Sequence, residues 1–437
     1  MRSLVKPQIL SQSPTSFIKH LRSLGINAFH ATFNSKTGKI EASHPEVKAI
    51  GEYFIDEGWD FDKHEGFFGQ IGPKSGVLQG AFIHRTCRGS GAGGVRNWHY
   101  ERVEDWFRDG LRLSRGMTHK NALAELWWGG GKGVLASNSG VGLGLNNGNL
   151  EQRRVVFEEY GTFLSELKGC YVTAEDVGMN GKFTTCIPPE IGGSGSPSFP
   201  TACGVVRALE ATFLHVGKKL EGSTIAIQGV GHVGKYIMDI LIEKGVKSIF
   251  ASDINSERIK DIKSEIVARN LNDRVKLSLL EGGDLSILFH DVDAIVPCAV
   301  GGILNPNTIP RIKTKIVCGA ANNQLGDLYK DDKLLADRGI IYVPGIVNCA
   351  DESAGYVDND PLFQRHLGDS WENSIFRRTQ DILKESSKRG TTPQQVTVEL
   401  AEKKSFELNP IWGHRGIQII NSVINSNEWK KKIRQSN

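Results

Sequence analysis

The amino-acid sequence predicts an α/β protein of two domains, and three observations carry this prediction. The chain has 437 residues, about three times the size of a typical single domain. Short apolar stretches rich in β-branched residues alternate with longer stretches whose apolar residues recur at helical spacing. A segment rich in Gly, Ser and Pro at 187–200 separates two such halves, which is typical of a domain boundary.

The composition excludes several classes of protein. Hydrophobic residues make up 39% of the chain and charged residues 23%, as in globular proteins, which excludes a disordered, collagen-like or disulfide-scaffold chain. No apolar run approaches the roughly 18–20 residues that cross a bilayer, so we expect no membrane association. The net charge of +4 is too small for this length to predict nucleic-acid binding. The 50 glycines exceed average usage and indicate backbone that approaches a ligand closely.

The seven cysteines are odd in number and widely spaced. No CxxC pair occurs, and no His or Cys lies beside another at the spacing of zinc ligands. We therefore expect reduced thiols, no metal site, and an intracellular, cytoplasmic protein.

Residues 1–44 differ in composition from the rest of the chain. They carry several basic residues and no acidic residue before Glu41, which is typical of a mitochondrial transit peptide and of a location in the mitochondrial matrix. The alternative is an ordinary N-terminal extension or the first helix of the fold. Residues 30–40 favour this alternative, because they predict a strand, a turn and a second strand.

Residues 45–200 are predicted to form the first domain. A helix is expected over 103–127, where Trp106, Phe107 and Met117 recur at helical spacing, and the glycine run 129–133 ends it. A strand follows this run, and then a helix over 153–167 and a strand over 171–176.

Residues 201–360 are predicted to form the second domain. A helix over 201–217 precedes a β-α-β unit, with strands at 223–228 and 248–253 around a helix at 232–244. Three further apolar strands, expected at 293–299, 314–320 and 340–345, favour a parallel sheet covered by helices on both faces. Residues 361–437 are expected to be C-terminal helices that pack back toward a cleft between the domains.

A glycine-rich motif at 229–234 follows the first strand of the β-α-β unit and opens its helix. Asp253 ends the next strand, which completes the context of a dinucleotide site in a Rossmann domain. The helix N-terminus offers N–H groups to the phosphates, and the Asp253 carboxylate suits the ribose hydroxyls of NAD and repels a 2′-phosphate. A purely structural glycine turn is the alternative. The predicted cofactor-binding residues of the motif are Gly229, Gly231, His232, Val233, Gly234 and Asp253.

Two lysines, Lys120 and Lys132, lie near the glycine run of the first domain. The run does not fit a phosphate-binding P-loop, because Gly133 and not Ser or Thr follows Lys132. One lysine could hold a substrate carboxylate, and the other could act as a general base beside Asp176 on a strand end. A solvated lysine is the alternative for each residue.

From about Phe67 to its end the chain resembles the glutamate, leucine, phenylalanine and valine dehydrogenases, a family of NAD(P)-dependent amino acid dehydrogenases. The spacing from Gly93 to Lys120 is closest to that of the leucine and phenylalanine members. The blocks that carry the resemblance are 93–96, 117–122, 129–132, 173–178, 229–234 and 319–324.

The resemblance implies a role for each residue of the first domain. Lys120 would bind the substrate α-carboxylate, Lys132 would activate a water, and Asp176 would move protons to and from the amine. Gly93 and Gly94 would line the carboxylate site. The expected reaction is reversible oxidative deamination of an L-amino acid to a 2-oxo acid and ammonia in the cleft between the domains.

The resemblance also extends the cofactor site and implies a homo-oligomer. Thr201 and Asn323 would lie at the nicotinamide end of NAD, with Asn322 near by, and Ala299 is assigned to the same site.

The sequence departs from the family pattern near the expected pocket, at Met179 and at Asn348 to Asp351. Glutamate members carry a lysine immediately before the Gly93-Gly94 block, where this chain has Ala92, so we expect an apolar substrate side chain. Arg96 is the competing cation, and we expect it to brace the fold or the α-carboxylate site. A glutamate-type enzyme and an inactive NAD-binding regulatory protein are the alternatives.

Overall fold

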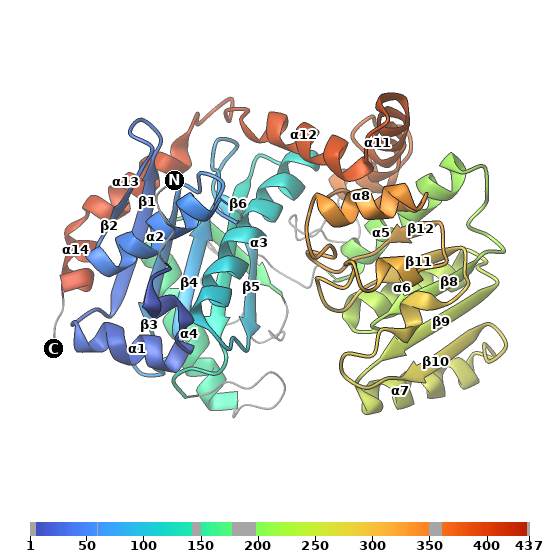
Figure 1. Ribbon diagram of the computed structural model, residues 1–437, viewed down its shortest axis with the longest axis horizontal. Helices are drawn as coiled ribbons and strands as arrows, with labels where there is room; N and C mark the ends of the chain where they lie inside the picture. The colour runs from blue at the N-terminus through green and yellow to red at the C-terminus, as the bar shows by residue number, and fades with distance from the viewer. Residues whose placement is uncertain (1–5, 59, 142–149, 177–197, 349–360, 435–437) are drawn as a thin grey trace. The chain divides into compact units, whose positions relative to one another are not determined.

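The computed structural model describes residues 6–58, 60–141, 150–176, 198–348 and 361–434 (Figure 1). The chain divides into two compact units. The first consists of Met1–Ala122, Leu126–Ser196 and Glu402–Asn437, and the second of Leu123–Glu125 and Pro197–Ala401. Among the described helices, none combines the length and apolarity that crossing a bilayer requires.

The first unit is built on a seven-stranded sheet with the strand order β2-β1-β3-β4-β6-β5-β7. Neighbouring strands from β2 to β6 are antiparallel, whereas β5 is parallel to both β6 and β7. The strands are β1 (Ala28–Asn34), β2 (Lys39–Ala42), β3 (Gly66–Ile71), β4 (Leu78–Ile83), β5 (Gly91–Trp98), β6 (Gly129–Ala136) and β7 (Tyr171–Glu175).

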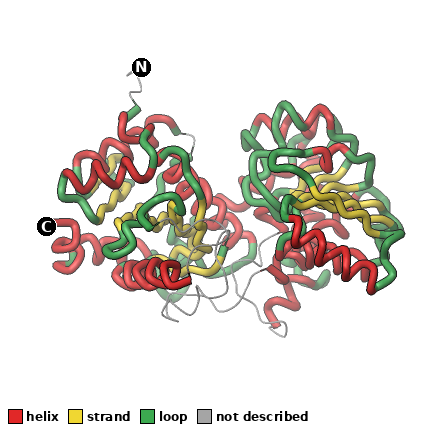
Figure 2. Tube along the Cα trace, turned by 90° about the horizontal axis from the view of Figure 1, so that it is seen from below, coloured by secondary structure: helices red, strands yellow, loops and turns green. Residues whose placement is uncertain are grey.

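Helices cover both faces of this sheet (Figure 2). Successive residues of β6 show this, because Val134 packs with Trp106 of α3 and Leu135 packs with Tyr160 of α4. The sheet is thus buried on two sides, which explains why its central strands are glycine-rich or apolar. The helices are η1 (Gln8–Ser11), α1 (Pro14–Ser23), α2 (Pro45–Glu57), α3 (Val103–Leu123), α4 (Leu150–Glu166), α13 (Arg415–Asn425) and α14 (Asn427–Arg434).

Residues 8–44 contribute to the core of the first unit, as expected if this segment contains the first helix of the fold. Ser13 caps α1 by accepting a hydrogen bond from Ser16 N at 3.3 Å, and Pro14 opens the helix. Phe17 of α1 is fully buried in an edge-to-face contact with Phe107 of α3. Strand β1 pairs with both β2 and β3, which confirms the expected strand, turn and strand.

The second unit contains a six-stranded parallel sheet with the order β10-β9-β8-β11-β12-β13. Numbered from its own first strand, this is the order 3-2-1-4-5-6 of a Rossmann fold, which confirms the predicted fold class. The order reverses between β8 and β11, and ligands of such sheets bind at the carboxyl ends of the strands there. The strands are β8 (Thr224–Gln228), β9 (Ser248–Asp253), β10 (Val275–Leu279), β11 (Ala294–Pro297), β12 (Ile316–Cys318) and β13 (Ile341–Val343).

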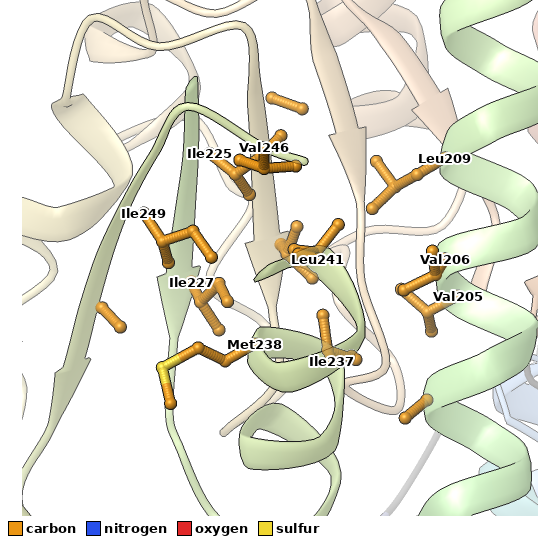
Figure 3. Close-up of a cluster of buried hydrophobic side chains, with 14 of the residues drawn as sticks. Val205, Val206, Leu209, Ile225, Ile227, Ile237, Met238, Leu241, Val246 and Ile249 are labelled. Atoms are coloured by element: carbon orange, nitrogen blue, oxygen red, sulfur yellow. The ribbon is translucent and has the colours of Figure 1, made fainter. Parts of the chain in front are cut away.

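A cluster of buried aliphatic side chains joins this sheet to its helices (Figure 3). Val205 and Leu209 of α5 and Ile237 and Leu241 of α6 belong to the same buried cluster as Ile227 of β8. This packing holds α5 and α6 against the sheet. The helices are α5 (Ser198–His215), α6 (His232–Glu243), α7 (Ser256–Ala268), η3 (Ser286–Phe289), η4 (Ile309–Arg311), α8 (Lys330–Asp337), α9 (Gly345–Asn348), α10 (Pro361–Leu367), α11 (Ile375–Arg389) and α12 (Pro393–Ser405).

Residues 361–434 form helices α10 to α14, as expected, and these helices contribute to both units. Helix α11 packs against α5, and its Ile375 enters the core of the second unit. Helix α14 returns to the first unit, where Trp429 Nε1 donates to His30 Nδ1 of β1 at 2.9 Å. Burial lowers the pKa of His30 to about 4, so the ring is neutral and its nitrogen can accept this bond.

Candidate functional site

Two charged side chains meet across β5 in the first unit. Lys132 lies in β6, Asp176 directly follows β7, and both strands are neighbours of β5. Val95 of β5 pairs with residue 133 of β6 and with residue 175 of β7. Lys132 therefore lies one residue before this level of the sheet, and Asp176 lies one residue after it. Lys132 Nζ donates to Asp176 Oδ2 in an ion pair, and the two side chains are only 1% and 8% exposed. The structure therefore brings the two predicted catalytic residues into direct contact.

The ion pair places an amine and a carboxylate in direct contact at a buried position. Groups of these two types can donate and accept protons, and general acid–base catalysis requires them within hydrogen-bond reach of the atoms that exchange protons.

The glycines around the pair let strands and side chains approach closely. A Cβ at Gly93 would collide with the backbone of Gly131 and would lie 2.9 Å from Met117 Cγ of α3. A Cβ at Gly131 would in turn collide with the Tyr171 ring, whose hydroxyl donates to Gly93 O at 2.8 Å. Gly93 is buried and Gly94 is half-buried. Of the two predicted substrate-site glycines, Gly93 is thus also required by the packing of β5 against β6.

A second charged pair lies next to Asp176, and its acidic member is not among the residues predicted from the sequence. Arg96 Nη1 donates to both carboxylate oxygens of Asp109 at 3.1 Å, and Tyr100 Oη donates to Asp109 Oδ2 at 2.6 Å. Arg96 Nε lies 4.0 Å from Asp176 Oδ2. Burial alone would lower the pKa of Arg96, but Asp109 and Asp176 outweigh it and raise that pKa. Arg96 is therefore bound within the site as a permanent cation, in agreement with its expected bracing role.

Lys120 and Ala92 lie where α3 crosses the start of β5. Lys120 is one turn after Met117 on the side of α3 that faces β5, and it is buried. The next residue, Asn121, donates from Nδ2 to Gly129 O and, at 3.5 Å, to Ala92 O. Ala92 is buried in the same region. The end of α3 therefore lies against the strands that carry Gly93 and Lys132.

The glycine motif of the second unit has the shape of a pyrophosphate cradle. Gly229 adopts a φ of +88°, and a Cβ there would lie 2.7 Å from Ala299 Cβ. A Cβ at Gly234 would collide with Gly229 O, whereas one at Gly231 would meet nothing nearer than Arg258 Nη1 at 4.0 Å. The open position lies at the N-terminus of α6, where Gly231 provides no side-chain cap. These residues fit a dinucleotide, whose phosphates would occupy that position.

Asp253 ends β9 beside the same turn and is fixed by backbone donors. Its Oδ2 accepts from Val230 N at 3.0 Å and its Oδ1 from Asn255 N at 2.9 Å. Arg258 Nη1 lies 3.4 Å from Asp253 Oδ2 and is partly exposed. Each carboxylate oxygen has a further lone pair with which it can accept a ribose hydroxyl. Arg258 is not among the residues predicted from the sequence, although its position in the first turn of the helix after Asp253 is a signal that indicates it.

The remaining predicted cofactor residues lie around the same edge of the sheet. Ala299 follows β11 and contacts the turn at Gly229. Asn322 and Asn323 follow β12, and Asn323 O accepts a hydrogen bond from Gly302 N at 2.8 Å. His232 and Val233 form the first turn of α6, and Thr201 is buried in the first turn of α5, which packs on α6. Met179 and residues 349–351 lie outside the described residues, and Asn348 ends α9.

Comparison with known proteins agrees with this arrangement. Residues 192–350 match the family model "Glutamate/Leucine/Phenylalanine/Valine dehydrogenase". Residues 74–189 match "Glu/Leu/Phe/Val dehydrogenase, dimerisation domain". Together the two matches cover more than half of the chain.

Individual relatives point to the same family. A leucine dehydrogenase of Geobacillus stearothermophilus is 36% identical over 302 residues, which cover 65% of this chain and 76% of that protein. A phenylalanine dehydrogenase of Lysinibacillus sphaericus is 34% identical over 357 residues, which cover 76% of this chain and 85% of that protein. The crystal structure of L-tryptophan dehydrogenase from Nostoc punctiforme has a TM-score of 0.59 at 30% identity, and the match covers 82% of this chain and 98% of that chain. The chain therefore belongs to the glutamate/leucine/phenylalanine/valine dehydrogenase family and is an amino acid dehydrogenase, closest to the leucine and phenylalanine type.

Proposed function

We propose that this enzyme uses NAD to oxidise an L-amino acid with an apolar side chain, releasing a 2-oxo acid and ammonia. The observation that carries the proposal is the buried Lys132–Asp176 pair beside the glycine-lined strand β5. A scaffold without turnover gains nothing from such a pair, because a buried ion pair is a weak source of stability.

The proposed mechanism assigns one task to each charged group. Lys120 binds the α-carboxylate and so orients the substrate Cα. Asp176 takes a proton from the substrate ammonium, which frees the nitrogen lone pair to expel the Cα hydrogen as hydride. NAD, when bound by the second unit, supplies the hydride acceptor.

Hydrolysis of the resulting iminium completes the reaction. Lys132, after releasing its proton to solvent, removes a proton from the water that adds to the iminium carbon. Asp176 then protonates the carbinolamine nitrogen, the C–N bond breaks, and the hydroxyl proton passes to the departing ammonia, which leaves the 2-oxo acid and ammonium. The sum is amino acid, NAD⁺ and water to 2-oxo acid, ammonium, NADH and a proton.

Ala92 and Arg96 support an apolar substrate. A buried γ-carboxylate without a cation would cost several kcal/mol, whereas an apolar side chain gains roughly 25 cal/mol per Å² of buried surface. Ala92 supplies no charge, and Arg96 is already bound by Asp109. The relatives named for leucine and phenylalanine agree with this preference.

The test of the proposed catalytic role is Lys132→Ala, with the exposed Lys48→Ala as its matched control. We expect loss of turnover in Lys132→Ala and unchanged NAD affinity, measured by quenching of protein fluorescence, since the second unit binds NAD. Lys48→Ala should retain wild-type activity. Near wild-type activity in Lys132→Ala would contradict the mechanism.

Substrate choice is tested by comparing kcat/KM for leucine, valine, phenylalanine and glutamate, following NADH absorbance. We expect kcat/KM for an apolar substrate to exceed that for glutamate by at least about 100-fold, which corresponds to roughly 3 kcal/mol. A preference for glutamate would refute the argument from Ala92 and leave the dehydrogenase activity itself intact.

We also propose a homo-oligomer that works inside the cell. The family description of residues 74–189 as a dimerisation domain supports an oligomer, which light scattering of the purified protein would test. The described cysteines Cys87, Cys170, Cys203, Cys298 and Cys318 are free thiols, as expected in a reducing compartment. Cleavage after residue 44 would remove β1 and β2, so we propose that residues 8–44 remain in the working enzyme.

A further inference from the structure

Three potential metal ligands converge in the first unit, away from the Lys132–Asp176 pair. Glu65 immediately precedes β3, Cys87 lies in the loop after β4, and His414 immediately precedes α13. One ligand atom from each lies within 4.8 Å of the others. His414 Nε2 is 2.8 Å from Glu65 Oε1 and 3.9 Å from Cys87 Sγ. Residues that are 349 positions apart in the sequence thus present a carboxylate, an imidazole and a thiol to one another.

Hydrogen bonds outside the cluster fix these side chains in place. Glu65 Oε1 accepts from Thr86 N at 2.8 Å, and its Oε2 accepts from the Thr86 hydroxyl. Cys87 O accepts from Asn409 N at 2.9 Å, which holds the segment before His414 against the loop after β4. Such outer contacts orient metal ligands and reduce the cost of assembling them.

The cluster is buried on one side and open on the other. The exposed fraction is 8% for Cys87, 11% for the Glu65 side chain and 32% for the His414 side chain. Water can therefore reach the imidazole edge and fill a fourth position. Three protein ligands with one open position is a common arrangement for zinc.

We propose that Glu65, Cys87 and His414 form a zinc-binding site. Zinc bonds of about 2.0–2.3 Å in a tetrahedron place ligand atoms roughly 3.3–3.6 Å apart, so the two measured separations need shifts of about half an ångström or less. The cation replaces the hydrogen-bonding protons that now lie between the three side chains. Thiolate and imidazole ligands favour zinc over magnesium and calcium, which prefer oxygen. No two of these residues lie at zinc-ligand spacing in the sequence, so sequence spacing alone does not predict this site.

Zinc at this position would tie α13 and α14 to the sheet. The preceding segment is already attached there, since Asn409 Nδ2 donates to Arg88 O at 3.1 Å and Arg88 forms an ion pair with Glu407. A cation bound only by the folded protein stabilises it by mass action. The site therefore assigns zinc a structural role in holding the C-terminal helices.

Calorimetric titration of reduced, chelator-treated full-length protein with zinc chloride tests the proposal. We expect one zinc per chain and a rise in Tm of a few degrees under excess zinc. Cys87→Ser and His414→Gln should each weaken binding at least 100-fold, whereas the control variants Cys203→Ser and His99→Gln should bind zinc normally. Equal affinity in Cys87→Ser, in His414→Gln and in wild type, or no binding to wild type, would overturn the proposal.

Two measurements on the wild-type protein keep the test valid if a variant fails to fold. Cobalt(II) in place of zinc should give the near-ultraviolet absorption of a thiolate ligand. Zinc should slow alkylation of Cys87 by iodoacetamide, measured by mass spectrometry of its peptide, and should leave alkylation of Cys203 unchanged. A cobalt complex without thiolate absorption, or no protection of Cys87, would refute the site.

Discussion

Replacing Asp109 with asparagine should destabilise the first unit. Asp109 accepts two hydrogen bonds from Arg96 and one from Tyr100, and the side chains of Arg96 and Asp109 are only 16% and 17% exposed. Removing one member of a buried ion pair costs about 3–5 kcal/mol, because the other charge remains without compensation. Asparagine can still accept one of these bonds, so we expect the lower end, about 3 kcal/mol.

The same substitution should slow catalysis. Arg96 Nε lies 4.0 Å from Asp176 Oδ2, and once released from Asp109 the guanidinium can turn toward Asp176 and compete with Lys132. Asp176 would then hold its charge more firmly and accept a substrate proton less readily. We expect kcat to fall at least about tenfold, equivalent to roughly 1.4 kcal/mol, while the KM for NAD stays unchanged.

Urea unfolding followed by tryptophan fluorescence measures the stability change, since seven of the eight tryptophans belong to the first unit. The control is Asp105→Asn, whose partner Arg102 is exposed, so little change is expected. A double variant, Arg96→Met with Asp109→Leu, should regain most of the lost stability but not the activity, because it leaves no buried charge unpaired. If Asp109→Asn unfolds at the wild-type urea concentration, the ion pair has no stabilising role and the reasoning fails.

Three further predictions concern the N-terminus, pH dependence and cofactor choice. A protein that begins at Pro45 should be insoluble when expressed, because it lacks α1, β1 and β2; a soluble, active product would contradict this. Burial raises the pKa of Asp332 from 3.8 to about 6, so the stability that its protonation gives the second unit is complete below about pH 3.8 and is lost as the pH rises through 6. Asp332→Asn should therefore raise the free energy of unfolding at pH 8 by about 3 kcal/mol, and raise Tm with it. The free energy of unfolding should also change less between pH 4 and 6 than in wild type, and an unchanged pH dependence would contradict the prediction. Wild type should have a higher kcat/KM with NAD than with NADP. Asp253→Asn should reduce this ratio, because Arg258 is then free to bind a 2′-phosphate. Equal kcat/KM with both cofactors in wild type would refute the role of Asp253.

Local patterns predicted the second unit well because its signals are local. The β8–α6–β9 segment contains its turn, its helix start and its acidic strand end within about thirty residues, and each has one structural interpretation. The N-terminus lacked such a signal, since Phe17, Ile18 and Leu21 on one side of α1 suit both a transit peptide and a core helix. Pairing of β1 with β3 places this part of the chain in the sheet, and it joins residues that lie far apart in the sequence.

The candidate site was predictable in part for the same reason. Glycine runs identified Lys132, and a strand end identified Asp176, but the contact between them depends on the register across β5. The Glu65–Cys87–His414 cluster depends on where the chain returns after α12. No pattern within any one of these segments indicates the other two.

The sequence does contain a signal for the Arg96–Asp109 ion pair, and this signal is the position of Asp109 in α3. Asp109 lies one turn after Trp106, and Trp106 and Gly110 both contact the sheet. A carboxylate on the buried side of an amphipathic helix requires a partner, because the free-energy cost of an unpaired buried charge is large compared with the stability of a folded protein. The pattern therefore predicts that a cation lies across from Asp109, without naming it. Strand register then selects Arg96, since β5 is the strand that also lies beside Asp176. The same ion pair that stabilises α3 therefore positions a cation beside the carboxylate for which we propose a catalytic role.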